Sequence, residues 1–216
     1  MSNELQDEFV KHHLRQSAEV LSEFATIAEY REMMISIAEV IANTFLSGQK
    51  VMIAGNGGSA GDAQHIACEL VTRLFFERGP LPAIALSSDS SVITAAGNDY
   101  GFEQIFTRQV AAFGSPGDVL WCLSTSGNSP NIVRACEKAK ETGITTIGFV
   151  GSEACSMNNT CDHILHVPTR KTTLVQQLHS VAAHIVCGIV EMRIFGSTDK
   201  NMAKTQMTGA PVAKRS

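Results

Sequence analysis

Hydrophobic positions along the chain change their spacing near residue 48. Over residues 4–25, apolar side chains from Leu5 to Phe24 recur mostly three to five positions apart, which predicts an amphipathic helix. A second helix is expected over 29–47, ending near Gly48. The first part of the chain, 1–48, is therefore expected to consist of two helices.

Short apolar runs bounded by turn residues predict strands in the next part of the chain. They lie at 50–55, 81–86, 118–124, 145–151 and 163–168. Helical patterns occur at 60–76, 102–113, 130–142 and 171–195. Alternating strands and helices favour an α/β fold whose parallel sheet is covered on both faces. We expect this domain to span 49–196 and the polar stretch 197–216 to be a loose tail.

Composition narrows the classes of function. The chain has 216 residues, of which 44% are hydrophobic, and a net charge of −4, so its overall charge does not favour nucleic acid. The charged N-terminus lacks an apolar leader, and no run approaches the roughly 18 apolar residues of a membrane span. Six cysteines without CxxC spacing are typical of reduced thiols. We therefore expect a cytoplasmic protein that binds neither nucleic acid nor membrane.

Two loops that follow predicted strands are suited to phosphate. Gly55 to Ser59 reads GNGGS, and Ser59 with Asp62 matches a helix-start signature, which would aim backbone N–H groups into the loop. Residues 124–130 read STSGNSP, with an N-cap serine followed by a proline at the first helical position. The second loop supplies the hydroxyls of Ser124, Thr125, Ser126 and Ser129. Ordinary strand–helix turns are the alternative for both loops.

A dinucleotide site is a rival interpretation of the first loop. Gly55, Gly57 and Ala60 satisfy a loose dinucleotide fingerprint, and Asp89 follows the next predicted strand. However, a long stretch of chain separates Asp89 from this fingerprint, and NAD binding does not need the second, hydroxyl-rich loop. An NAD-dependent dehydrogenase therefore ranks behind a phosphate-binding protein.

Polar side chains on two predicted helices suggest a reaction centre. His65 and Glu69 are four residues apart on one helix face. In the apolar last helix, Gln176 and His184 are eight residues apart, about 80° round the helix axis, so both side chains could line one groove. Two imidazoles, a carboxylate and an amide oxygen could hold Zn²⁺ or a similar ion in a catalytic site, because thiolates are absent. A helix-stabilising pair and a satisfied core histidine are the alternatives.

These motifs together resemble the sugar isomerase (SIS) domain family, and within it the bacterial phosphoheptose isomerases. The resemblance rests on GNGGS leading to H-x-x-x-E, then GND at 97–99, then STSGNS, then Q-x-x-x-x-x-x-x-H in the last helix, and it covers roughly residues 5–195. It implies a three-layer SIS fold with a five-stranded parallel sheet. It also implies conversion of sedoheptulose 7-phosphate to D-glycero-D-manno-heptose 7-phosphate through an enediol.

The resemblance assigns roles to individual residues. It implies that Glu69 and His184 are catalytic base and acid, and that zinc is held by His65, Glu69, Gln176 and His184. It implies phosphate contacts from Ser124, Thr125, Ser126 and Ser129, and substrate contacts from Asn56, Gly57, Gly58, Glu69, Arg73, Asn98, Asp99 and Gln176. It further implies homotetramers with active sites at subunit interfaces, in which the N-terminal helices would take part.

Some SIS proteins are not enzymes, and they form the competing class. They bind a phosphosugar as a signal, or they assist assembly of a replication initiator. Such relatives tend to lack the acid/base set, whereas this chain has both Glu69 and His184. The sequence therefore favours an isomerase.

Overall fold

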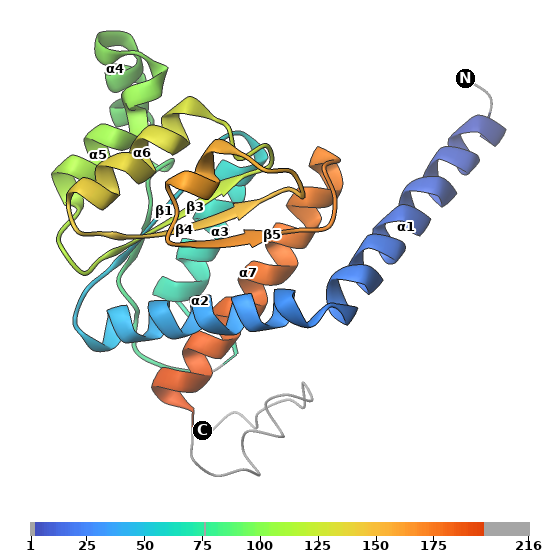
Figure 1. Cartoon of the computed structure of the whole chain (residues 1–216), viewed down its shortest axis with the longest axis horizontal. Helices are drawn as coiled ribbons and strands as arrows, with labels where there is room; N and C mark the ends of the chain where they lie inside the picture. The colour runs from blue at the N-terminus through green and yellow to red at the C-terminus, as the bar shows by residue number, and fades with distance from the viewer. Residues whose placement is uncertain (1–2, 76, 197–216) are drawn as a thin grey trace.

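Two long helices form the N-terminal part of the chain in the computed structural model, which describes residues 3–75 and 77–196. Helix α1 (Asn3–Thr26) projects away from the body of the protein, and α2 (Ala28–Leu46) lies along the sheet (Figure 1). Only Val20 and Phe24 of α1 are buried, whereas α2 contributes seven buried residues. Thus α2 is part of the core, and most of α1 is not.

A five-stranded parallel sheet forms the centre of the fold, as predicted. In chain order its strands are β1 (Val51–Gly55), β2 (Ala83–Ala85), β3 (Val119–Ser124), β4 (Thr145–Val150) and β5 (His163–His166). In space their order is β2-β1-β3-β4-β5. β1 and β3 are neighbours in the sheet but are separated by β2 in the chain, so the carboxyl ends of these two strands mark the switch point where α/β folds bind ligands.

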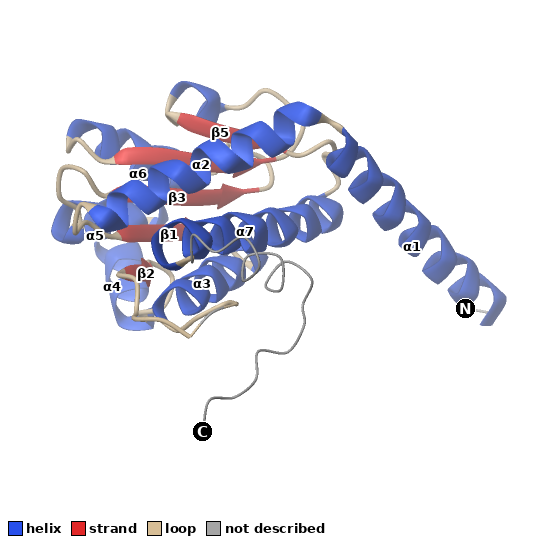
Figure 2. Cartoon of the chain, turned by 90° about the horizontal axis from the view of Figure 1, so that it is seen from below, coloured by secondary structure: helices blue, strands red, loops and turns tan. Residues whose placement is uncertain are grey.

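Helices cover both faces of the sheet (Figure 2). Helices α2, α3 (Gly58–Val71) and α7 (Thr172–Phe195) share one face, and α4 (Ser90–Tyr100), α5 (Ile105–Phe113) and α6 (Pro130–Glu141) lie on the other. Side chains alternate between two cores, with Ile53 and Trp121 in the first and Met52 and Leu120 in the second. Short 3₁₀ helices at Phe102–Gln104 and Ser156–Asn159 complete the described elements.

Three predicted helix boundaries were wrong. The helix expected over 60–76 begins earlier, with Gly57 as its N-cap at φ 53°, so Ser59 is buried in the first turn and does not cap the helix. The same helix ends at Val71. The segment expected as one helix over 102–113 starts as a 3₁₀ turn before α5.

Side chains explain the early end of α3. Arg78 donates to the carbonyl oxygens of Glu69 and Leu70, at 2.8 Å in each case, and takes the places of backbone N–H donors in a continuing helix. Glu191 accepts from the N–H groups of Leu74 and Phe75, at 2.8 Å each. Arg73 therefore lies in a loop, not one further turn along the helix.

Helix α4 was not predicted. Asp89 is its N-cap, and its carboxylate accepts hydrogen bonds from the N–H groups of Ser91 and Val92. The signal was an Asp followed by two serines, which is a helix start in its own right. Since the Asp89 carboxylate is engaged in capping, it is poorly suited to the ribose contact of a dinucleotide site.

Helix α7 is long and apolar enough, by length and composition, to cross a membrane, but half of that stretch is buried inside the fold. It packs against α2 and α3, as the central helix of a globular domain does. The expected tail at 197–216 lies outside the described residues, and the division at residues 48 and 49 stays a prediction.

Candidate active site

The two phosphate-type loops meet at the switch point of the sheet. Asn56, in the loop after β1, exchanges two side-chain hydrogen bonds of 2.8 Å with Asn131 at the start of α6. These bonds tie the loop after β1 to the helix that follows β3. Asn56, Gly57 and Gly58 therefore lie beside the loop at 124–129, where contacts to one ligand would be expected.

The loop after β3 is organised by its own hydroxyls. Ser124 Oγ accepts from the Gly127 N–H at 3.1 Å and lies 3.3 Å from Ser129 Oγ. Gly127 has φ 64°, and a Cβ there would meet the Cys155 Sγ atom, so the turn requires glycine. Ser129 is the N-cap of α6 and Pro130 its first residue, as predicted, although the Ser129 side chain makes no capping bond.

The four predicted phosphate hydroxyls are not equivalent. Ser124 is buried and engaged within the loop. Thr125 and Ser126 instead line a pocket of about 260 Å³. Thr125 and Ser126 are therefore the two of the four that border this pocket, while Ser129, which is half-buried, lies 3.3 Å from Ser124 Oγ.

Helices α3 and α7 run parallel and contact each other at three levels. At the first, Gln176 lies against Gly58, where a Cβ would come within 2.4 Å of the Gln176 Nε2 atom. At the second, His184 meets His65. At the third, Glu191 accepts from the backbone beyond α3. The contact between α3 and α7 thus holds their polar residues in a fixed order along the two helices.

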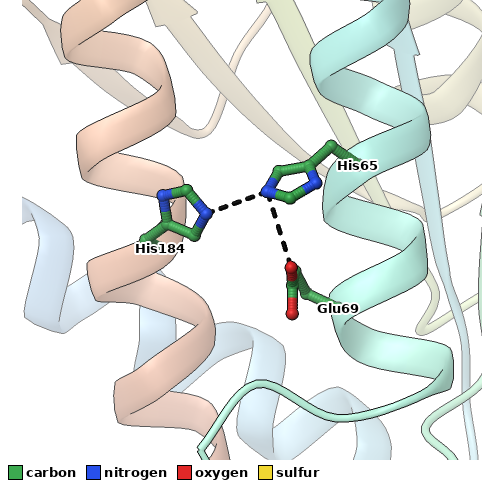
Figure 3. Close-up of side chains that lie close together, drawn as sticks. All are labelled: His65, Glu69 and His184. Carbon is green, nitrogen blue, oxygen red and sulfur yellow. Dashed lines mark hydrogen bonds and ion pairs between the residues drawn. The ribbon is translucent and has the colours of Figure 1, made fainter. Parts of the chain in front are cut away.

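Three titratable side chains converge at the second level (Figure 3). The Nε2 atoms of His65 and His184 are 2.8 Å apart, with the rings edge to face at 77°. His65 Nε2 lies 3.5 Å from Glu69 Oε1, and Glu69 is half-buried while His65 is 47% exposed. The sequence prediction that His65, Glu69 and His184 come together is thus met by the geometry.

This cluster has donors that fit a zinc ion. One donor atom from each of the three residues lies within 4.8 Å of the others. In a tetrahedral site with bonds of about 2 Å, ligand atoms lie about 3.3 Å apart, and the two closest separations here, 2.8 and 3.5 Å, bracket that value. Two imidazoles and a carboxylate are also the protein ligands of a type of catalytic zinc site.

Gln176 lies outside this cluster. It is eight residues before His184, about 12 Å along the axis of α7, and its amide group packs at Gly58. A four-ligand site would need the Gln176 side chain to turn away from Gly58. In its observed position Gln176 is closer to the loop after β1 than to the imidazoles.

Arg73, Asn98 and Asp99 are not members of the cluster of His65, Glu69 and His184. Arg73 is exposed and pairs with Glu77 at 3.5 Å. Asn98 donates to the Asp99 carboxylate at 2.8 Å near the end of α4, on the opposite face of the sheet from α3 and α7. Their predicted substrate contacts stay predictions.

Sequence reasoning missed the buried ion pair that joins α7 to the loop after α3. Arg78 Nε donates to Glu191 Oε1 at 2.7 Å, with side-chain exposures of 1% and 0%. The available signal was Glu191 near the end of an apolar helix, since a buried carboxylate requires a cation or several donors.

Two more side chains on these helices have buried polar atoms without a well-aligned hydrogen-bond partner among the described residues, the half-buried Asp62 and the buried His179. The pKa of Asp62, one turn before His65, is raised by burial, while the His65 charge acts to lower it. His179 is fully buried against Phe149, with ring centroids 5.7 Å apart. Burial lowers the pKa of His179 to about 4, so its ring is neutral at pH 7.

Comparisons with known proteins agree with this geometry. The SIS domain family model matches residues 12–151. The phosphoheptose isomerase of Clostridium acetobutylicum is 48% identical over 188 residues, which cover 87% of this chain and 96% of that protein. The chain belongs to the SIS domain family, among the phosphoheptose isomerases.

Solved structures support the same assignment. A phosphoheptose isomerase from Francisella tularensis superposes with a TM-score of 0.84 at 33% identity, covering 89% of this chain and all of that one. Phosphoheptose isomerase GmhA from Neisseria gonorrhoeae gives a TM-score of 0.81 at 35% identity, covering 86% of this chain and 98% of that one. The expected three-layer SIS fold and the expected enzyme class are thereby confirmed.

Proposed function

We propose that this enzyme converts sedoheptulose 7-phosphate to D-glycero-D-manno-heptose 7-phosphate, and that Glu69 and His184 carry the proton transfers. One observation carries the assignment of residues. Glu69, His65 and His184 form a cluster where α3 and α7 pack together. The chain is 48% identical to a phosphoheptose isomerase over most of its length.

The phosphate end of the substrate is proposed to bind at residues 124–129, where Thr125 and Ser126 donate from their hydroxyls. The N-terminus of α6 adds backbone N–H groups and a favourable dipole for an anion. Asn56, Gly57 and Gly58 would then face the carbon chain. Binding energy from this end holds the reacting carbons in place without taking part in the chemistry.

Isomerisation moves a proton between C1 and C2 through an enediol. Glu69 is suited to remove and return this carbon-bound proton as a carboxylate base. His184 is suited to move protons on the oxygens, because its Nε2 atom faces the same space as the Glu69 carboxylate. The Nε2 atoms of His65 and His184 are 2.8 Å apart, so both imidazoles face the space in which the Glu69 carboxylate lies.

Zinc fits this proposal as a cofactor. His65, Glu69 and His184 would hold it, with Gln176 as a further ligand after its side chain turns. A bound zinc ion would polarise the substrate carbonyl and stabilise the enediolate. Coordination would make the Glu69 carboxylate a weaker base, so catalysis would need either loose ligation of Glu69 or its release when the substrate enters.

Assembly into a homotetramer is the further part of the proposal. Helix α1 exposes a row of large apolar side chains, among them Phe9 at 69% and Leu14 at 64%. Exposure of this apolar surface to water is unfavourable for a single chain, and other copies of the chain would bury it. Arg73, Asn98 and Asp99 could then reach a substrate bound at a subunit interface. A cytoplasmic location is consistent with the six cysteines, which are all free.

The test is incubation of the purified protein with sedoheptulose 7-phosphate, followed by chromatographic detection of the aldoheptose phosphate. Turnover that requires both Glu69 and His184 is the expected result. Tight binding of the sugar phosphate without product would reject the isomerase and favour a phosphosugar-sensing role.

A further inference from the structure

A charged pair lies at the edge of the pocket that Thr125 and Ser126 line. This pocket, of about 260 Å³, is also bordered by the loops after β4 and β5. Those loops bring Ser152 and Glu153 from one side and Arg170 and Thr172 from the other. The proposed phosphate loop therefore forms only one wall of the space in front of it.

Backbone hydrogen bonds hold the three loops together. Gly151 donates to the Thr125 carbonyl oxygen at 3.2 Å, and Ser152 donates to the Thr169 carbonyl oxygen at 3.0 Å. A Cβ at Gly151 would come within 2.8 Å of the Thr125 oxygen and 3.1 Å of the Thr169 oxygen. Only glycine allows this approach, so the positions of Glu153 and Arg170 relative to the phosphate loop are built into the fold.

Arg170 has the only cationic side chain among the described residues that line this pocket. Its Nη1 atom lies 3.2 Å from Glu153 Oε1, and the two side chains are 82% and 67% exposed. Exposed ion pairs of this kind contribute little to stability and exchange readily. A guanidinium group binds phosphate oxygens through two parallel hydrogen bonds, which a loose carboxylate contact does not match.

We propose that Arg170 binds the phosphate group of the substrate, and that Glu153 competes with this phosphate for the guanidinium group. The Arg170 side chain leaves Glu153 when a phosphate monoester occupies the loop at 124–129. The loop itself supplies only neutral donors, and Arg170 supplies the positive charge that a dianionic phosphate requires. The inference rests on the proposed function in one respect, the location of the phosphate end of the substrate.

Inorganic phosphate is the probe for a direct test, with its Kd measured by isothermal titration calorimetry on the full chain. Arg170→Ala is expected to weaken phosphate binding about tenfold, as the loss of a charge-assisted contact does. Arg170→Lys should recover part of this loss. Glu153→Gln should act in the opposite direction and tighten binding, because it removes the competitor.

Arg193→Ala is the matched control. Arg193 forms a similar exposed ion pair, 2.8 Å from Glu39, but at the far end of α7. This variant should leave the phosphate Kd unchanged. An unchanged Kd in Arg170→Ala, or weaker binding in Glu153→Gln, would overturn the proposal.

Steady-state kinetics separates this inference from the proposed reaction. With sedoheptulose 7-phosphate, Arg170→Ala should raise KM about tenfold while kcat changes less than about twofold, since the phosphate is remote from the reacting carbons. A protein that binds phosphate through Arg170 but forms no aldoheptose phosphate would reject the reaction and retain the binding role. Normal turnover with an unchanged KM in Arg170→Ala would reject the binding role alone.

Discussion

Arg78 and Glu191 form a buried ion pair that joins the loop after α3 to α7, with 2.7 Å between Arg78 Nε and Glu191 Oε1. Both partners are further satisfied by backbone groups, since Arg78 donates to Glu69 and Leu70 and Glu191 accepts from the loop. The pair therefore determines where α3 ends, two residues beyond the Glu69 carboxylate.

Breaking this pair should destabilise the fold strongly. We expect Arg78→Met to lower the free energy of unfolding by about 3–5 kcal/mol, because it leaves the Glu191 carboxylate buried without a cation. Urea denaturation of the purified variants measures this change. Arg193→Met, which removes the exposed partner of Glu39, should cost less than about 1 kcal/mol. Equal effects of the two substitutions would contradict a special role for the buried pair.

Glu69→Gln should abolish turnover while substrate still binds. The amide cannot act as the base, so kcat should fall by about 10²- to 10⁴-fold, with the Kd for sugar phosphate changed only slightly. Glu77→Gln, on the exposed carboxylate that pairs with Arg73, is the control and should retain normal kcat. Near-normal activity of the Glu69 variant would remove it from the role of base.

Metal content should depend on the two histidines of the cluster. We expect about one zinc ion per chain in the parent protein, and a loss of most of it in His65→Ala and in His184→Ala. Elemental analysis after dialysis measures the metal, and His12→Ala, on the exposed side of α1, is the control. Full activity of metal-free protein after chelation would reject zinc as a cofactor.

The buried His179 should make stability depend on pH. Burial is the main cause of its low pKa of about 4 in the folded protein, against 6.5 as the ordinary value, and the Val150 backbone opposes this shift by less. Neither ring nitrogen of His179 forms a well-aligned hydrogen bond with a group among the described residues. As the pH falls, the unfolded chain therefore takes up the His179 proton before the folded protein does. The contribution of the neutral His179 to the free energy of unfolding is complete above about pH 6.5 and is lost as the pH falls toward 4.

Urea denaturation at a series of pH values tests this assignment. His179 should contribute at most about 1.4 kcal/mol per pH unit to the slope of the free energy of unfolding between pH 4 and 6.5. His179→Phe keeps an aromatic ring against Phe149 and should flatten the slope. An identical pH dependence in this variant would assign the effect to other groups.

The exposed face of α1 should be needed for assembly. Phe9→Lys combined with Leu14→Lys is expected to reduce the oligomer to smaller species, because it places charge on the apolar surface. Sedimentation equilibrium gives the mass, and Glu19→Lys, at another exposed position of α1, is the control. A parent protein that sediments as a monomer would contradict the tetramer.

The sequence was sufficient where one rule of local structure decided the outcome. Strand–helix alternation predicted the parallel sheet, and the spacing of His65 and Glu69 predicted their shared face. The sequence-based prediction failed where residues distant in the chain decide the structure. At the end of α3, Arg78 and Glu191 terminate a helix that the local sequence pattern would continue. It also could not show that the Gln176 amide packs at Gly58, since that contact depends on how α7 lies against α3.

The parallel packing of α3 on α7 fixes the distance between the loop after β1 and the cluster of His65, Glu69 and His184. Gly58, the first residue of α3, and His65 are seven residues apart, which is about 10 Å along a rigid helix. If the phosphate binds at residues 124–129 as proposed, the carbon backbone passes Gly58 and must be long enough to bring the carbonyl to the level of His65, so a shorter homologue would bind yet leave its carbonyl out of reach. Discrimination among sugar phosphates would then come from the rise of a helix, and inserting one residue between positions 58 and 65 would disrupt it by turning the reacting groups about 100° away.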